Sequence, residues 1–370
     1  MFGIENLPGF LPSLFWGIIT ISLLVFIHEA GHYLAARALG LKVTEFFIGL
    51  PGPSISFKRG DTRFGITCIP LGGYVRIPAL EGSGPAAELG VMTEEERKEY
   101  DKIPAWKRVV VLLAGVVTNL IFAIAVLTAL FSYTGIPSNS IDPIEGGPAY
   151  TAGIPEGVHF TAVDDQKVEG FQEFTQAIAG REVGDTITLS FKTSEGITQS
   201  RDVTLAPRSE VFPNDPDGFV ASNPDAPSVG VTISMENEAV SVGRAFTYSF
   251  EFIVMVAEVI SRFFSPETFP EAVSEASSII GISVIAAHTA DAGFISYISL
   301  LALISISLGL MNLLPIPPLD GGKIMFEIIQ KVIGRPVPEQ LYVGVSLAGF
   351  ALLIIFMIYL MGQDLFRIFG

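Results

Sequence analysis

The chain has 370 residues, of which 49% are hydrophobic and 16% are charged, and its mean hydropathy is +0.52. This composition is typical of a membrane protein with several spans and one small folded domain. The net charge of −16 argues against a nucleic-acid partner. A single cysteine, Cys68, excludes an internal disulfide, and the 4 histidines are too few for a His-rich metal buffer.

In chain order, four apolar stretches are long enough to cross a membrane, which takes about 20 predominantly apolar residues. The predicted transmembrane helices occupy residues 1–39, 108–134, 291–322 and 341–370. No Lys or Arg precedes the first apolar stretch and polar groups follow it, so a cleaved signal peptide is the poorer interpretation. The chain is therefore expected to be a polytopic α-helical membrane protein.

The first apolar stretch runs into His28-Glu29-Ala30-Gly31-His32. Two histidines four residues apart lie on one face of a helix, where both can bind one Zn²⁺, and the glutamate between them can take a proton from water. Such groups are costly at membrane depth unless they pair with one another or with a metal. The motif predicts a hydrolytic zinc site in the membrane, with His28 and His32 as ligands and Glu29 as the base. Two packing histidines beside an unrelated glutamate are the alternative.

Residues 40–107 are predicted to be a cytoplasmic loop with membrane-associated β-hairpins. Short β-prone runs punctuated by Gly and Pro within 48–77 indicate these hairpins. Their apolar character favours a sheet partly in the membrane, where non-helical backbone is tolerated only against protein or a wet cavity. An ordinary cytoplasmic hairpin is the alternative. A substrate can add to such a sheet as a further strand, so Gly72, Gly73 and Tyr74 are candidate substrate-binding residues.

Residues 135–210 are predicted to form one small domain rich in β structure. Residues 186–191 alternate between apolar and polar side chains, which is typical of a half-buried strand, and residues 171–179 have helical spacing. Residues 211–242, which include many Pro, Asp and Asn, are predicted to be a linker.

Residues 243–290 are predicted to form helices that lie in the membrane interface. Within 245–264, Glu251 and Glu258 are seven residues apart and share one helical face. Two acidic side chains on one face suit a helix lying on the membrane better than a span, because a charge at the bilayer centre is costly. A true span at 245–264 is the alternative.

A catalytic zinc site needs a third protein ligand and an open position. The candidates near membrane depth are His288, Asp291, Asp320 and Asp364. Asp320 is favoured because the prolines of 315–318 stop the preceding helix, and the two glycines after Asp320 allow a turn that directs its carboxylate inward. His288 and Asp291 precede that span and are expected to be structural or interfacial, while Asp364 lies beyond the last span.

Charge predicts the orientation of the chain in the membrane. Basic residues are concentrated in 40–108 and in a second loop at 323–340, whereas 134–243 has 17 Asp and Glu against 5 Lys and Arg. The positive-inside rule makes both basic loops cytoplasmic, with both termini and the acidic segment outside. The expected location is therefore the inner (cytoplasmic) membrane, crossed several times.

These motifs occur together in an order that resembles the bacterial site-2 proteases, the intramembrane zinc metalloprotease family that includes the sigma-E regulating protease. The residues that carry the resemblance are the His28–His32 motif, 69–77 (IPLGGYVRI), 105–108 (AWKR) followed by Ala114-Gly115 and Asn119, and 313–322 (LLPIPPLDGG). The resemblance implies Zn²⁺ bound by His28, His32 and Asp320, with Glu29 activating water.

The resemblance also assigns roles to Asn312 and to the β-rich domain. Asn312 resembles the family's residue that helps bind substrate or stabilise the developing oxyanion. Asn119 is a polar residue within the second predicted span, and because such residues are costly there unless they serve a role, it is expected to be either a structural strut or a substrate contact. The domain at 135–210 is implied to be a PDZ domain facing outside, because 146–149 and 152–154 resemble the beginning of one. The better-known sigma-E regulating members carry two PDZ domains, and this chain has room for one.

The implied reaction is hydrolysis of a peptide bond in the transmembrane segment of single-pass membrane proteins, such as an anti-sigma factor or a signal-peptide remnant, in regulated intramembrane proteolysis. The implied partners are these substrates, shortened beforehand by another protease, a peptide at the PDZ domain, and the lipid bilayer. A catalytically inactive scaffold that binds partners through its PDZ domain is the alternative, although a structural zinc site would close with a fourth ligand and would not need Glu29. A metal transporter is disfavoured because it needs ionisable groups along more than one span.

Overall fold

The computed structural model describes residues 7–49, 52–69, 72–81, 94–137, 140–168, 174, 177–178, 180–193, 196–212, 225–233, 237–335 and 337–369. The chain divides into two compact units, Met1–Phe131 with Ser241–Gly370, and Ser132–Val240. The first unit carries the long apolar helices and the His28–His32 motif, and the second unit is the β-rich domain.

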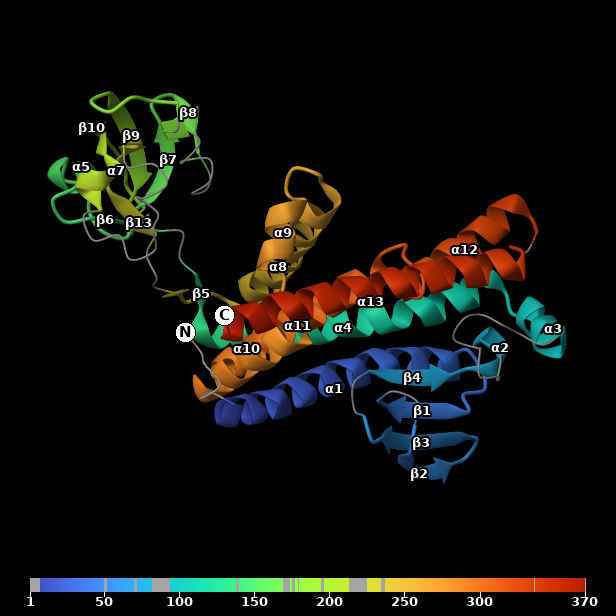
Figure 1. The fold of residues 1–370 in the computed structure, drawn as a ribbon. Helices are drawn as coiled ribbons and strands as arrows, with labels where there is room; N and C mark the ends of the chain where they lie inside the picture. The colour runs from blue at the N-terminus through green and yellow to red at the C-terminus, as the bar shows by residue number, and fades with distance from the viewer. Residues whose placement is uncertain are drawn as a thin grey trace. The chain divides into compact units, whose positions relative to one another are not determined.

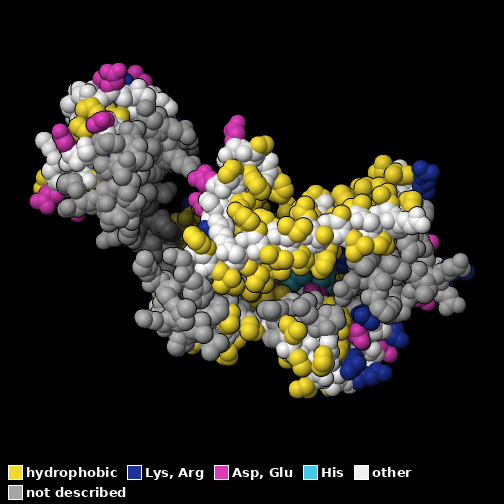
Figure 2. Space-filling view, in the orientation of Figure 1, with side chains coloured by type: hydrophobic (Ala, Val, Ile, Leu, Met, Phe, Trp, Pro, Cys, Tyr) yellow, Lys and Arg dark blue, Asp and Glu magenta, His cyan; other side chains and the backbone are white. Residues whose placement is uncertain are grey.

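Four helices in the described part of the first unit are long and apolar enough to cross a membrane, as predicted. They are α1 (Leu7–Ala38), α4 (Ala105–Thr134), α11 (Phe294–Leu313) and α13 (Glu339–Phe369), which run alongside one another in Figure 1. A helix satisfies its backbone hydrogen bonds internally, as the hydrocarbon core requires. Only 6% of the apolar part of α13 is buried within the protein. Hydrophobic side chains gather over α13 on the face shown in Figure 2, so the surface of this helix suits contact with lipid.

Three further helices precede α11: α8 (Val242–Ser261), α9 (Phe269–Glu275) and α10 (Ile279–Asp291). The Ser241 hydroxyl caps α8 by accepting the backbone N–H of Arg244 at 3.3 Å. The interfacial position of α8 stays a prediction. Helices α9 and α10, bent by 53° at their junction, are together apolar enough to form a broken span or a re-entrant loop. Helix α10 also packs closely on α1, because Gly17 leaves room for Ser283.

Asp364 lies inside α13 and joins this helix to the start of α10. Its Oδ2 accepts the backbone N–H groups of Ser278 and Gly281 at 2.7 and 3.1 Å, and its Oδ1 pairs with Arg367 at 3.3 Å. A carboxylate at a helix N-terminus satisfies unpaired N–H groups and interacts favourably with the helix dipole. Because Asp364 is only 3% exposed, this candidate zinc ligand serves instead as a buried cap.

Replacing Asp364 with alanine is expected to lower the free energy of unfolding by about 1–2 kcal/mol, the upper range for a lost helix cap. Thermal unfolding of the detergent-solubilised protein measures this loss. Asp291→Ala is the matched control, because it removes an exposed carboxylate at the other end of α10. Equal stability of the two variants would contradict the capping role.

Four strands form a mixed sheet beside α1, in the order β2-β3-β1-β4. They are β1 (Glu45–Ile48), β2 (Ser54–Arg59), β3 (Thr62–Thr67) and β4 (Gly73–Arg76). β1 runs parallel to β3 and antiparallel to β4, and a tight turn joins β2 to β3. One buried cluster joins the sheet to α1, with Phe46 packed against Tyr33. By contrast, Ile55 and Phe57 of β2 are 88% and 65% exposed.

The chain turns back sharply between α11 and α12 (Asp320–Ile333). The turn requires Gly321 and Gly322, because a Cβ on either would overlap the preceding backbone. α12 ends at Gly334, whose φ of 73° lies in the left-handed region that favours glycine. The predicted third transmembrane element therefore ends at Leu313 rather than at residue 322. The predicted loop at 323–340 is helical as far as Ile333, because α12 buries an apolar face that includes Phe326.

A buried ion pair fixes α12 to the start of α4. Arg108 donates through Nε and Nη2 to Oε2 of Glu327 at 2.9 and 2.7 Å. Tyr100 of α3 (Glu94–Lys102) donates its hydroxyl to the same carboxylate, and Arg108 lies over its ring, 4.1 Å from the centroid. Burial and the negative charge of Glu327 raise the pKa of Tyr100 well above its usual value, so the phenol keeps its proton. Because α12 begins at Asp320, this cluster holds the helix that carries a candidate ligand.

The second unit is built on an antiparallel sheet in the order β10-β9-β7-β8. Its strands are β7 (His159–Val163), β8 (Gln166–Lys167), β9 (Thr186–Lys192) and β10 (Thr198–Thr204). Ile187, Leu189 and Phe191 of β9 are 0% exposed. Thr188 and Ser190, between them, hydrogen-bond to side chains of β10. The alternation in the sequence thus places one face of β9 in the core.

Short strands return the chain to the beginning of the second unit. The pairs are β5 (Ile136–Pro137) with β14 (Asn237–Glu238), β6 (Ile141–Pro143) with β13 (Val231–Ile233), and β11 (Ala206–Pro207) with β12 (Pro227–Ser228). The described part of this unit also contains two short helices: α5 (Pro148–Thr151), which follows β6, and α7 (Arg208–Val211), which follows β11. The predicted linker at 211–242 therefore contributes three strands. Strands of two or three residues are too short to show a period of two in the sequence.

Candidate metal centre

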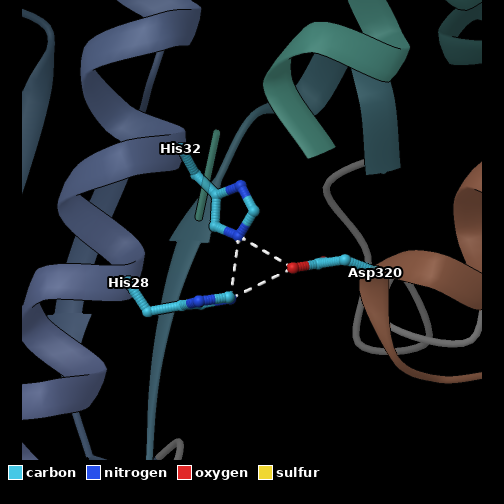
Figure 3. A group of neighbouring side chains, drawn as sticks. All are labelled: His28, His32 and Asp320. Carbon is cyan, nitrogen blue, oxygen red and sulfur yellow. Dashed lines mark hydrogen bonds and ion pairs between the residues drawn. The ribbon is translucent and has the colours of Figure 1, made fainter. Parts of the chain in front are cut away.

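Three side chains from distant parts of the sequence meet at one point (Figure 3). His28 and His32 project from α1, and Asp320 projects from the first residue of α12. Oδ2 of Asp320 lies 3.0 Å from Nε2 of His28 and 3.1 Å from Nε2 of His32, and the two Nε2 atoms are 3.2 Å apart. None of the three residues is more than 8% exposed. The structure thus brings together the three residues that the sequence suggested as zinc ligands.

The donor atoms and their spacing fit a tetrahedral zinc ion. Two ligand atoms that each lie about 2.0–2.1 Å from such an ion are about 3.3–3.4 Å apart, close to the separations among these three atoms. Nδ1 of His32 donates to the Val111 carbonyl oxygen at 2.8 Å, so Nε2 is the nitrogen left for a metal. Within the described part of the chain, no other group of three His, Cys, Asp or Glu side chains converges in this way. Three protein ligands leave one position open, as catalytic zinc requires.

One face of α4 lies against the two histidines. Val111, Gly115 and Asn119 share this face because they are spaced by four residues. The Val111 carbonyl accepts from His32, and the Asn119 amide lies 3.3 Å from Nδ1 of His28. Between them, a Cβ on Gly115 would lie 2.5 Å from Nε2 of His32 and 2.7 Å from Cε1 of His28. Reasoning from sequence noted Gly115 and Asn119 only within the family resemblance and missed Val111. The signal in the sequence that could have indicated this face of α4 is the spacing of a glycine and an asparagine four residues apart in an apolar helix.

Glu29, the predicted base, lies on α1 beside the beginning of β4. A Cβ on Gly73 would lie 3.2 Å from Cγ of Glu29 and 2.8 Å from Cγ1 of Val25. Gly73 therefore allows the strand to approach the helix turn that carries Glu29. The ring of Tyr74 stacks on the ring of Phe47, its partner on the neighbouring strand β1, with 5.3 Å between the ring centroids. The structure thus places the predicted substrate-binding residues Gly73 and Tyr74 on β4, an edge strand of the described sheet, next to the predicted base.

The other sequence candidates have different surroundings. His288 and Asp291 are exposed near the end of α10, and Asp364 caps the start of that helix. Asn312 lies in the last turn of α11, where its amide nitrogen donates to the Leu308 carbonyl at 3.0 Å. Its contact with substrate stays a prediction.

Comparison with known proteins extends the similarity to nearly the whole chain. The model of peptidase family M50 matches residues 16–356. A protein of Mesorhizobium japonicum, provisionally named a zinc metalloprotease, is 32% identical over 368 residues, covering 96% of this chain and 99% of its own. Zinc metalloprotease RasP of Shouchella clausii is 25% identical over 425 residues, covering 95% of this chain and 98% of its own. The PDZ domain of an SdrC-like protein of Listeria monocytogenes is 22% identical over 27% of this chain and 88% of its own, with a TM-score of 0.20.

Two buried histidines on an apolar helix, with a glutamate between them and a buried aspartate from α12 beside them, define a membrane-bound metalloprotease. The chain belongs to peptidase family M50. The predicted resemblance to site-2 proteases is therefore confirmed, as are the predicted enzyme class and cofactor: the protein is a zinc metalloprotease.

Proposed function

We propose that this enzyme hydrolyses a peptide bond within the transmembrane segment of single-pass membrane proteins, such as an anti-sigma factor or a signal-peptide remnant, in regulated intramembrane proteolysis. The observation that carries the proposal is the position of the candidate ligands. His28 and His32 lie within the membrane-length part of α1, Pro12–Ala38. A site on this helix can reach a peptide bond that the bilayer hides from a soluble protease.

The chain's own residues supply binding, orientation and proton transfer. His28, His32 and Asp320 would hold a zinc ion, which when bound polarises the scissile carbonyl and acidifies a water molecule. Glu29, half-buried beside these ligands, takes a proton from the attacking water and delivers it to the leaving amine. Asn312 helps to bind the substrate or to stabilise the developing oxyanion.

The substrate is proposed to bind as an extended strand on β4, through Gly72, Gly73 and Tyr74. A helix hides its carbonyl groups in internal hydrogen bonds, so the scissile segment must unwind and find new partners. An edge strand offers such partners. The exposed apolar side chains of Ile55 and Phe57 support a position of the sheet at membrane depth, because a large exposed apolar surface suits lipid.

The proposed location is the inner (cytoplasmic) membrane, with both termini and the second unit outside. The acidic character of 134–243 and the basic character of 40–108 support this orientation. The second unit is proposed to be a PDZ domain that binds a peptide or a substrate already shortened by another protease. Its antiparallel sheet with short flanking helices supports this assignment.

Cleavage of a fluorescent single-span substrate by the purified protein tests the proposal. Glu29→Gln is expected to keep zinc and to slow cleavage by about 10²–10⁴-fold, the range for loss of a general base. Asp320→Asn is expected to weaken both zinc binding and cleavage. Glu258→Gln, an equivalent change at an exposed position of α8, is the matched control and should cleave like the unmodified enzyme.

Two results would overturn parts of the proposal. Cleavage by Glu29→Gln at the unmodified rate would exclude Glu29 as the base. If the zinc-loaded enzyme cuts none of a broad panel of single-span substrates, the inactive scaffold becomes the better account.

A further inference from the structure

Asn119 presents a hydrogen-bonding mismatch at the metal centre. Its side chain is 0% exposed within α4, yet its Oδ1 has no hydrogen-bond partner among the described residues. Its Nδ2 lies 3.3 Å from Nδ1 of His28. In this orientation the amide nitrogen, a donor, faces a ring nitrogen of a candidate ligand, while the acceptor oxygen of the same amide is unused, and this pairing calls for an explanation.

The chemistry of His28 as a ligand supplies one. A neutral imidazole carries its proton on one nitrogen only, so an Nε2 that binds zinc leaves the proton on Nδ1. An Nδ1–H group needs an acceptor, which an amide nitrogen is not. The two ends of an amide have nearly the same shape, so a half-turn of the Asn119 side chain brings Oδ1 to the position opposite Nδ1 of His28.

We propose that Asn119 is a positioning residue for His28: its Oδ1 accepts the Nδ1–H hydrogen bond and holds the imidazole in the tautomer whose Nε2 binds zinc. This inference rests on the proposed role of His28 as a ligand. The arrangement matches that of His32, whose Nδ1–H is accepted by the Val111 carbonyl on the same face of α4. One helix therefore fixes the tautomers of both histidines.

Neighbouring contacts hold the Asn119 backbone in place for this role. Ser305 of α11 donates its hydroxyl to the Asn119 carbonyl at 3.0 Å. Gly309, also on α11, lies against the same residue, since a Cβ there would be in ordinary van der Waals contact with the Asn119 Cβ, at 3.5 Å. A positioned acceptor on a metal-bound histidine typically contributes about 10–100-fold to metal affinity, so the role is measurable apart from proteolysis.

Zinc affinity of the purified full-length protein, measured by competition with a fluorescent chelator, tests the proposal. Asn119→Leu, which removes the acceptor at similar size, is expected to weaken zinc binding by about 10–100-fold. Asn119→Asp retains an acceptor oxygen and is expected to lose less than about tenfold in zinc affinity. Thr247→Val is the matched control, because it removes an exposed hydroxyl on α8 that donates to the Gly243 carbonyl one turn earlier. Asn119→Ala serves as the second acceptor-free variant if Asn119→Leu does not fold.

The outcomes separate this role from simple helix packing and from failure of the ligand assignment. Zinc binding by the acceptor-free variant equal to that of the unmodified protein would overturn the proposal. Equal losses in Asn119→Leu and Asn119→Asp would also overturn it, because the acceptor would then not be what matters. Unchanged zinc affinity in His28→Ala would instead show that the proposed ligand set is wrong.

Discussion

A Gly115→Ala variant is expected to purify without bound zinc and to leave a single-span substrate uncleaved. The added methyl group would lie 2.5 Å from Nε2 of His32, the atom available to the metal, and 2.7 Å from Cε1 of His28. The imidazoles cannot simply move aside, because the same helix holds His32 through the Val111 carbonyl at 2.8 Å. A carbon atom would therefore occupy space that the ligands need. Metal analysis and the cleavage assay measure the two losses.

Gly344→Ala is the control for the Gly115 variant. Gly344 also lies within a long apolar helix, α13, but a Cβ there would meet nothing within 4 Å. Alanine is a better helix former than glycine by about 1 kcal/mol, so this variant should fold and bind zinc normally. Stoichiometric zinc in Gly115→Ala would show that α4 does not press on the ligands as the structure indicates.

Replacing Arg108 with methionine is expected to lower the free energy of unfolding by about 3–5 kcal/mol, the range for breaking a buried ion pair from one side. The pair is buried, since the Arg108 and Glu327 side chains are 12% and 6% exposed. Loss of the guanidinium leaves the Glu327 carboxylate buried without its positive partner. Within this described cluster, the carboxylate then keeps only the hydrogen bond from the Tyr100 hydroxyl. Unfolding in detergent, followed by heat or denaturant, measures the loss.

Two further variants decide whether burial causes the Arg108 effect. Arg244→Met breaks an ion pair with Glu251 whose side chains are 46% and 48% exposed, and such surface pairs contribute about 0–1 kcal/mol. A double change, Arg108→Met with Glu327→Leu, removes both buried charges and should recover most of the lost stability. Similar losses in Arg108→Met and Arg244→Met would contradict the predicted role of burial.

The parts of the fold and site that the sequence predicted depend on local patterns. The spacing of His28 and His32 follows from one helix turn, and each membrane helix follows from its own apolar run. The position of Asp320 was accessible because prolines and glycines around it determine a sharp turn locally. These features can be predicted without knowing how the helices pack against one another.

What the sequence did not predict depends on contacts between distant residues. Arg108 and Glu327 are 219 positions apart, so the sequence of α12 alone indicated only a basic loop. Asp364 caps a helix 86 positions earlier, which no local pattern reveals. Val111 contributes a backbone carbonyl, a group that every residue carries, so its role follows only from the packing of α4 on α1.

The distance along the chain between the candidate ligands has a thermodynamic consequence. His28 and Asp320 are 292 positions apart. An ion bound to both would therefore be a tertiary cross-link between α1 and α12, two helices from distant parts of the sequence. The unfolded chain does not present these ligands together, so the free energy of metal binding adds to the free energy of folding. At a free ion concentration of one hundred times Kd, mass action adds about 2.7 kcal/mol. Depletion of zinc would therefore make the protease easier to unfold as well as inactive, and would couple its lifetime in the membrane to the supply of metal.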